Sequence, residues 1–209
     1  MTTPSWLNQG SLVLASNNKG KVVEFEHLFQ QLNLPVEIIP QGKLDIEDAI
    51  EDGLSFVENA IIKARHACQV TGLPALADDS GLCVDALGGA PGIYSARYAG
   101  AGAKDADNNA KLLRDLADIR QRKAHFHCAL VFVRHPEDPA PIICEGRWLG
   151  EVVDTPRGDN GFGYDPHFFI PALNKCAAEL PPEQKNRLSH RGLAVSQLVK
   201  RLPTEFGGS

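Results

Sequence analysis

The sequence lacks the features that would place the protein in a membrane, outside the cell or along nucleic acid. No run approaches the roughly 20 apolar residues that a transmembrane helix needs. Residues 1–11 show no basic segment followed by an apolar one, so we expect no signal peptide. Basic residues are few: 21 lysines and arginines against 26 acidic residues give a net charge of −5. This balance argues against a broad basic face for nucleic acid, but it leaves room for a local site that binds a small anion.

Paired cysteines are also missing. The five cysteines are odd in number and widely spread, and no two form a C-x-x-C pair. Free thiols in a reducing cytoplasm are therefore expected rather than a disulfide framework or a zinc site. His125 and His127 alternate along an expected strand and share a face, but two histidines without a third nearby ligand are weak evidence for zinc.

What is present suits one soluble α/β domain. The 209 residues are 43% hydrophobic, enough for a core in a single domain, residues 1–209, with at most two lobes. Hydrophobic spacing predicts helices at 19–33, 54–70, 105–119 and 182–202. It predicts strands at 11–16, 36–39, 75–77, 82–84, 124–134, 141–150 and 151–154, with a turn at Gly150. Strands that alternate with helices, followed by adjacent strands at 124–154, predict a mixed sheet flanked by helices.

A small polar turn joins the first expected strand to the first expected helix. Exposed backbone N–H groups, a helix N-terminus and lysine charges would together form a phosphate cradle. The segment is not a P-loop, because the first glycine and the final hydroxyl residue are missing. A capped helix start with exposed lysines is the alternative. The residues are Ser16, Asn17, Asn18, Lys19, Gly20 and Lys21.

Two acidic segments could bind a metal ion. Residues 45–58 carry no lysine or arginine, and Glu51 and Asp52 directly precede Gly53 and the best helix of the chain, at its N-terminal side. Acidic residues there complement the helix dipole, and a magnesium-ligand role is the sharper alternative. Asp78 and Asp79 follow an apolar strand, where neighbouring side chains point to opposite faces. One would bind metal or act as a base while the other orients local backbone; an Asx-turn at a strand end is the alternative.

Two segments of the C-terminal half could bind a flat ligand. Three glycines around Phe162, at 158–166, favour a binding loop in which this ring stacks on a base, with a tight surface loop as the alternative. Lys185 and Ser189 are expected four apart on one helical face, with His190 and Arg191 adjoining it. Such donors suit phosphates or the carbonyl oxygens of a base, while helix capping would also explain them.

Together these segments resemble the Ham1-type inosine triphosphate pyrophosphatase family, in particular its bacterial members that hydrolyse dITP, ITP and XTP. The matching segments occur in the family's order: SNNKGK at 16–21, SFVENAIIKA at 55–64, ADDSGLCVDALGGAPGIYSARYAG at 77–100, GFGYDP at 161–166 and SHRG at 189–192. The resemblance implies an enzyme that converts a purine nucleoside triphosphate to its monophosphate and pyrophosphate. That activity would remove non-canonical nucleotides before they enter DNA or RNA. It further implies two lobes with the active site in the cleft between them, dependence on Mg²⁺ and a homodimer.

The resemblance also assigns residues. Asp79 corresponds to the catalytic carboxylate and metal site, residues 16–21 to the triphosphate-binding turn, and Lys63 to a lysine near the phosphates. The substrate contacts correspond to Ser80, Phe162, Gly163, Tyr164, Asp165, Lys185, His190 and Arg191. Residues 48–52 depart from the family's E-E-T-G form, with Ile50 where many relatives carry a glutamate, so Glu51 is the best candidate for the second metal ligand.

A mechanism follows from charge. Asp79 is the expected base for the attacking water, and Lys21 and Lys63 are expected to hold the phosphates beside Mg²⁺. His190 or Arg191 could favour the 6-oxygen of hypoxanthine or xanthine over the amino group of adenine. Three other functions remain: a Maf-like pyrophosphatase for other nucleotides, a catalytically silent nucleotide-binding regulator, and a nucleic-acid-binding protein. The GFGYDP and SHRG segments argue against the Maf-like activity, and the presence of Asp79 and Lys21 argues against a silent regulator. The charge balance argues against a nucleic-acid-binding protein.

Overall fold

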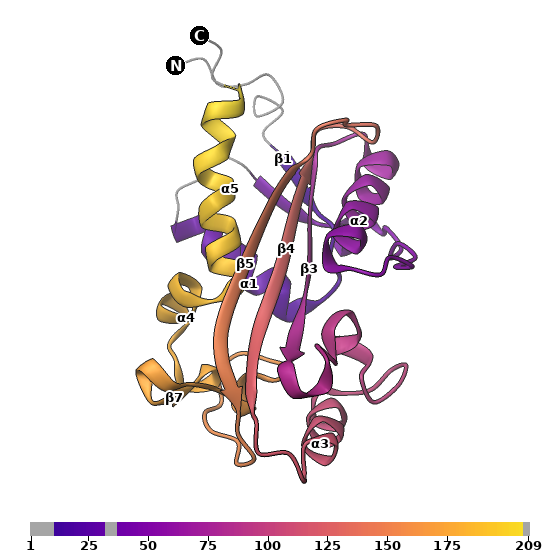
Figure 1. Cartoon of the computed structure of the whole chain (residues 1–209). Helices are drawn as coiled ribbons and strands as arrows, with labels where there is room; N and C mark the ends of the chain where they lie inside the picture. Colours follow the sequence, from indigo (N-terminus) through magenta and orange to yellow (C-terminus); the bar gives the residue numbers. More distant parts are fainter. Residues whose placement is uncertain (1–10, 32–36, 207–209) are drawn as a thin grey trace. The chain divides into compact units, whose positions relative to one another are not determined.

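The fold is built on one mixed sheet of seven strands (Figure 1). The computed structural model describes residues 11–31 and 37–206. The strand order is β2-β1-β3-β4-β5-β6-β7. β1 pairs in parallel with β2 and β3, while β6 pairs antiparallel with β5 and β7, which confirms the predicted mixed sheet. The strands are β1 Ser11–Leu14, β2 Glu37–Pro40, β3 Ala75–Val84, β4 Lys123–Val133, β5 Ile142–Val152, β6 Phe168–Ile170 and β7 Lys175–Cys176.

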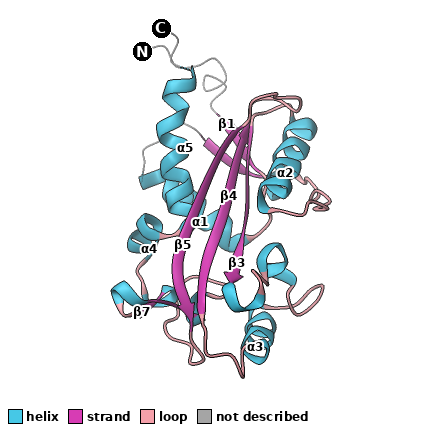
Figure 2. Ribbon diagram, in the orientation of Figure 1, coloured by secondary structure: helices cyan, strands magenta, loops and turns pink. Residues whose placement is uncertain are grey.

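The chain divides into two compact units. Unit 1 comprises 1–79, 129–145 and 194–209, and unit 2 comprises 80–128 and 146–193. The boundaries fall inside β3, β4 and β5, the three long strands of Figure 2, and inside helix α5. The α-helices are α1 Lys19–Gln31, α2 Phe56–Thr71, α3 Asp105–Asp115, α4 Pro182–Leu188 and α5 His190–Phe206.

The core cluster of unit 1 that includes α2 consists mostly of small side chains. Ala60, Ala64 and Ala67 repeat at helical spacing along α2, and all three are fully buried. They pack against Val13 of β1 and Val131 of β4. Because alanine side chains are short, α2 can lie close to the sheet. The N-terminus of α2 is fixed by Ser55, whose Oγ accepts from the backbone N–H of Glu58 and donates to the Glu58 carboxylate.

Unit 2 has an aromatic core. The Phe126 and Phe168 ring centroids are 4.5 Å apart, and Trp148 lies 5.3 Å from Phe168. Leu112 and Leu116, from the end of α3 and the turn after it, complete the same buried cluster. The two units therefore bury separate sets of apolar residues.

Two predicted strand breaks are wrong. The segment 78–81 was expected to interrupt the strand, but β3 runs unbroken from Ala75 to Val84. Likewise β5 runs through Gly150, where a turn was expected. A Cβ at Gly150 would lie 2.6 Å from the Phe168 ring and from the Phe169 carbonyl oxygen. This glycine therefore marks the close approach of β6 rather than a turn.

The helix boundaries also differ from the prediction. α3 ends at Asp115 rather than at 119. The expected single helix over 182–202 is two helices, because Ser189 has an extended backbone with φ −70° and ψ 159°. Its Oγ accepts from the Gly192 N–H at 3.2 Å, so Ser189 caps α5. Lys185 and Ser189 consequently do not share one helical face.

Two expectations from the composition can be compared with the structure. Within 11–31 and 37–206, no helix has both the length and the apolar character to cross a membrane. All five cysteines are free, as expected: Cys68, Cys83, Cys128, Cys144 and Cys176.

Candidate active site

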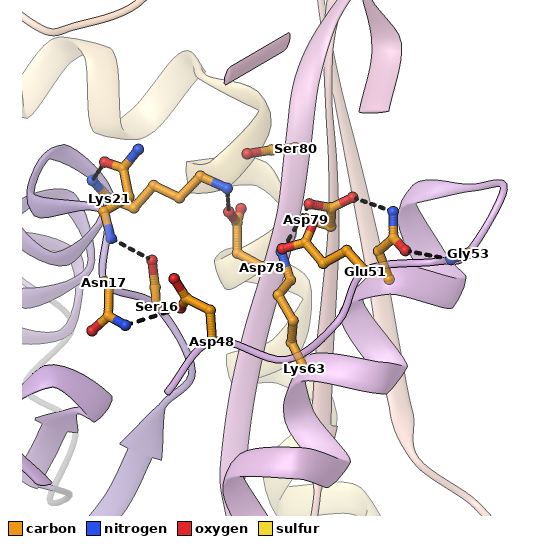
Figure 3. A network of polar contacts seen from close by, with 12 residues as sticks. Ser16, Asn17, Lys21, Asp48, Glu51, Gly53, Lys63, Asp78, Asp79 and Ser80 are labelled. Atoms are coloured by element: carbon orange, nitrogen blue, oxygen red, sulfur yellow. Dashed lines mark hydrogen bonds and ion pairs between the residues drawn. The ribbon is translucent and has the colours of Figure 1, made fainter. Parts of the chain in front are cut away.

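Two lysine–aspartate pairs lie at the centre of unit 1. Asp78 and Asp79 are consecutive residues of β3, so their side chains point to opposite faces of the sheet. The Lys21 ammonium of α1 lies 2.6 Å from Asp78 Oδ1, and the Lys63 ammonium of α2 lies 2.8 Å from Asp79 Oδ1 (Figure 3). The Asx-turn that was the alternative prediction is not formed. Both aspartates lie within the strand, where lysines from two helices pair with their carboxylates.

Glu51 joins the second pair. Its Oε1 lies 3.2 Å from the same Lys63 ammonium that contacts Asp79. The structure therefore brings together Asp79, Lys63 and Glu51, three of the four residues for which the sequence predicted catalytic or metal-binding roles; the fourth, Lys21, contacts the neighbouring Asp78. Figure 3 shows the end of the Lys63 side chain beside both Glu51 and Asp79.

Burial and charge oppose each other in this cluster. Burial raises the pKa of the Asp79 carboxyl, although Lys63 and Lys21 act in the opposite direction. Burial works against the charged form of Lys63 as well, but Asp79 and Glu51 outweigh it and raise the pKa of the ammonium. Lys63 thus stays protonated at neutral pH. An additional cation beside Asp79 would favour its ionised form.

The oxygen atoms of the cluster fit a magnesium ion. Mg²⁺ binds hard oxygen ligands, and it is commonly held by one or two carboxylates together with substrate phosphates. Asp79 and Glu51 supply two carboxylates that lie close together, because both contact the Lys63 ammonium. In the described part of the chain, no three histidine, cysteine, aspartate or glutamate side chains are grouped to hold a metal. The donor set therefore suits an ion that shares its ligands with a phosphate group.

The polar turn of 16–21 is ordered by its own side chains. Ser16 Oγ accepts from the Asn18 N–H at 3.2 Å, and Asn18 Oδ1 accepts from the Lys21 N–H at 3.1 Å. Asn18 thereby caps α1, as the alternative interpretation proposed. Asn17 Nδ2 donates to Asp48 Oδ1 at 2.9 Å, which ties the turn to the acidic segment. Lys19 is exposed at the helix start. The cap leaves the phosphate-cradle interpretation intact, because the helix N-terminus and Lys21 remain at the turn.

Unit 2 brings together a second group of the predicted residues. The Lys185 ammonium lies 2.6 Å from Asp165 Oδ2, and both side chains are almost fully buried. The same Asp165 oxygen accepts from the Phe162 N–H at 3.0 Å. Lys185 also lies 5.2 Å from the centroid of the Phe162 ring. The 161–165 loop is therefore held to α4 through Asp165, with the half-buried Phe162 ring beside the lysine.

Helix α3 holds the same loop from another side, which the sequence interpretation missed. Asp105 Oδ2 accepts from the Gly163 N–H at 2.7 Å, and Asn109 Nδ2 donates to the Gly163 carbonyl at 2.9 Å. The Tyr164 hydroxyl donates to the Ser95 carbonyl at 2.7 Å. The signal for Asp105 and Asn109 was their spacing of four residues at the start of a helix, which sets both on one face.

The remaining predicted residues lie at the start of α5 and on β3. Arg191 is 1% exposed, and its Nη2 donates to Ser80 Oγ at 3.0 Å. The buried His190 ring stacks on Phe126, with centroids 4.8 Å apart and an interplanar angle of 13°. Ser80 follows Asp79 directly along β3, so the chain itself links the two groups of residues.

Two further residues of unit 1 were not assigned to the site from the sequence. Asp78, expected only to orient local backbone, has Lys21 as a partner. Asn59 of α2 is fully buried and donates to Asp79. The sequence showed Asn59 only as a polar residue on a helix with apolar residues at 56, 60, 61, 64 and 67 on one side.

Comparisons with known proteins identify the family of the chain. The sequence profile of the Ham1 family matches residues 12–201. A relative in Acinetobacter baumannii named dITP/XTP pyrophosphatase is 64% identical, over 93% of this chain and 96% of its own length. A protein of the same name in Ralstonia nicotianae is 60% identical, over 91% and 96%. The solved structure of a HAM1 protein from Coxiella burnetii is 50% identical with a TM-score of 0.85, and covers 93% of this chain and 98% of that one. The Staphylococcus aureus Ham1 protein is 40% identical with a TM-score of 0.81, over 93% and 99%.

Proposed function

The chain belongs to the Ham1 family, and on that premise we propose that it hydrolyses dITP, XTP and ITP to the nucleoside monophosphate and pyrophosphate. The observation that carries the proposal is the cluster of Asp79 on the buried strand β3 with Lys63 and Glu51, and with Lys21 paired to the neighbouring Asp78. Lysines beside carboxylates suit a reaction that separates two phosphate groups, because cationic groups stabilise the charge of the leaving pyrophosphate.

We assign the chemical step to unit 1. Asp79 takes a proton from a water molecule whose oxygen bonds to the α-phosphorus, while the bond from that phosphorus to the bridging oxygen of the β-phosphate breaks. Lys21 and Lys63 exchange part of their contact with Asp78 and Asp79 for contacts with the phosphates. Asp79 and Glu51 would hold Mg²⁺, which supplies charge neutralisation and polarises the phosphoryl oxygens when bound. The N–H groups of the 16–21 turn complete the phosphate contacts.

We assign base recognition to unit 2. The Phe162 ring offers a stacking surface, with Gly163 and Tyr164 in the same loop. Lys185, His190 and Arg191 are donors, so they favour a 6-oxo purine over adenine, whose 6-amino group is itself a donor. Asp165 keeps Lys185 in place, and Ser80 does the same for Arg191.

The test is a pyrophosphate-release assay with Mg²⁺ across ITP, dITP, XTP, GTP, ATP and dTTP. We expect rapid release from ITP, dITP and XTP and little from ATP. Equal rates on ATP and ITP would overturn the proposed specificity. A preference for dTTP would favour a Maf-like activity, and tight ITP binding without release would favour a silent regulator. The Asp79→Asn protein, purified in the same way, controls for contaminating phosphatases.

We also propose that the protein is a cytoplasmic homodimer, in which this activity removes non-canonical nucleotides from the pool used for DNA and RNA synthesis. The five free thiols suit a reducing compartment. Light scattering coupled to gel filtration tests the dimer directly: a mass near twice 22.6 kDa is expected, and a mass of one chain would contradict it.

A further inference from the structure

Asn59 occupies an unusual place in the described part of unit 1. Its side chain is fully buried, although it is polar. Its Oδ1 accepts from the Gly53 N–H at 2.9 Å, and its Nδ2 donates to Asp79 Oδ2 at 3.4 Å. One planar amide thus contacts both the loop before α2 and the carboxylate on β3. Gly53 and Asp79, the partners in these two contacts, are labelled in Figure 3.

The helix itself does not need this side chain. α2 has its own N-cap in Ser55, with Glu58 completing the capping arrangement. Asn59 lies in the first turns of the helix, where a buried apolar residue would pack at less desolvation cost. An amide differs from every apolar residue and from an ionised carboxylate in carrying an acceptor and a donor on one rigid group. In Asn59 the acceptor contacts the Gly53 N–H and the donor contacts the Asp79 carboxylate.

The loop before α2 is fitted closely around this amide. A Cβ at Gly53 would lie 2.7 Å from Asn59 Oδ1 and 2.7 Å from Glu58 Cβ. Only glycine therefore allows the backbone at this position to approach Asn59 as it does. Gly53 lies two residues after Glu51, so the contact fixes the backbone that carries the Glu51 carboxylate.

Lys63 makes the matching contacts from the next turn of α2. Its ammonium contacts both Glu51 Oε1 and Asp79 Oδ1. Asn59 and Lys63 are four residues apart, so they lie on one face of the helix. The amide holds the backbone of the Glu51 loop and one oxygen of Asp79, while the ammonium contacts the Glu51 carboxylate and the other oxygen of Asp79.

We propose that Asn59 is a positioning residue for the divalent cation: it couples the Glu51 loop to Asp79, so that the two carboxylates are presented together. This inference rests on the proposed function, because it takes the pair Asp79 and Glu51 as the metal ligands. Outer contacts of this kind orient a ligand before the metal arrives, and their removal commonly weakens metal affinity by roughly 10- to 100-fold.

The test measures metal binding without turnover. Mn²⁺ is titrated into the full-length protein with an ITP analogue whose α–β bridge is not hydrolysable, and free Mn²⁺ is followed by electron paramagnetic resonance. For Asn59→Ala we expect Mn²⁺ affinity to fall by roughly 10-fold or more. Gly53→Ala, which keeps the amide and displaces the loop, is expected to weaken binding in the same direction. An Asn59→Ala protein that binds Mn²⁺ within two-fold of the wild type would overturn the inference.

A double-mutant cycle separates positioning from general stability. If Asn59 acts through the Glu51 loop, Glu51→Gln costs much less Mn²⁺ affinity in the Asn59→Ala background than in the wild type. Additive losses would show that the two residues act independently, against the inference.

Asn108 of α3 supplies the matched control. It is also a buried asparagine that joins a helix to a loop, with Oδ1 accepting from the Ala99 N–H at 2.8 Å and Nδ2 donating to the Ala96 carbonyl at 3.2 Å. Asn108→Ala should lower thermal stability yet leave Mn²⁺ affinity unchanged. An equal loss of affinity in both variants would point to destabilisation alone. If the wild type fails to release pyrophosphate, the proposed function fails; if it does release it but Asn59→Ala binds normally, only this inference fails.

Discussion

At the scale of single residues, strand geometry gives two adjacent aspartates different surroundings. Asp78 lies against Lys21, and its side chain is completely buried. Asp79 faces Lys63, Glu51 and Asn59 on the opposite side of β3. Asp79 shares the Lys63 ammonium with a second carboxylate, that of Glu51. In the proposed mechanism, the adjacent pair would therefore divide into Asp78, the partner of a phosphate-binding lysine, and Asp79, the base and metal ligand.

Asp79→Asn should separate catalysis from folding. The amide has nearly the same shape, and burial already raises the pKa of the Asp79 carboxyl, so a neutral group should cost the fold little. Lys63 keeps its contact with Glu51. We expect kcat for dITP to fall by roughly 10²- to 10⁴-fold, with an unchanged circular dichroism spectrum. A kcat within ten-fold of the wild type would show that another group accepts the proton.

At the scale of elements, the sequence predicted the helices and strands that are specified by a local pattern of residues. α2 was expected from its apolar spacing, and its boundaries differ from the expectation by one or two residues. β3 was expected in two pieces, because Asp-Asp-Ser-Gly is typical of a turn. Its continuity depends on Lys21 and Lys63, which are distant in sequence and neutralise the two aspartates. No local pattern contains that information.

The residues of the candidate site also divide into those that the sequence predicted and those that it missed. Asp79 and Lys63 were predicted, since the resemblance carries residue types at fixed positions, and Glu51 was predicted as the best candidate beside Ile50, where the sequence departs from the family pattern. Asn59, Asp105 and Asn109 were not, because each contacts a backbone group of a loop outside its own helix. Almost any residue type can supply a backbone N–H or C=O group, so the sequence does not identify the partner in such a contact. Ser189 was misassigned for a different reason: a serine can cap a helix or lie within one, and only the backbone decides.

The hairpin between β4 and β5 should make stability depend on pH. Burial works against the Asp138 carboxylate, but hydrogen bonds from the Arg134 side chain and from the N–H groups of Arg134 and Ala140 lower its pKa to about 2. The ordinary value is 3.8. A depressed pKa in the folded state stabilises the protein above pH 4, and this contribution, about 2 kcal/mol, is lost as the pH falls from about 4 towards 2.

Urea unfolding of the wild type and of Asp138→Asn between pH 6 and pH 3 measures this contribution. The amide cannot ionise and loses the charge of the carboxylate towards Arg134, so the variant should unfold at lower urea near pH 6. The difference between the two proteins should shrink below pH 4. A difference that does not vary with pH would show that the Asp138 charge is not what stabilises the hairpin.

At the scale of the whole molecule, the net charge of −5 hides an uneven distribution. In the described part of unit 1, Asp78, Asp79 and Glu51 surround Lys21 and Lys63, which leaves one negative charge in excess at this cluster. A polyanionic nucleotide would be repelled by the cluster alone. A divalent cation reverses the sign, so the charge balance itself favours binding of the metal together with the substrate.

Two separate cores raise the question of whether the chain unfolds once or twice. β3, β4 and β5 each contribute residues to both units, and neighbouring strands of the sheet are hydrogen-bonded to one another. Because a strand that loses its partner at one end weakens the ladder at the other, we expect one cooperative transition, as the prediction of a single domain requires.

Val131→Ala in the core of unit 1 and Leu112→Ala in the core of unit 2 should each lower the midpoint of the same transition in calorimetry. The leucine substitution should lower the free energy of unfolding by about 2–5 kcal/mol. Equal calorimetric and van't Hoff enthalpies in all three proteins are the expected result, whereas a Leu112→Ala protein that melts in two steps would mean that each core folds as its own domain.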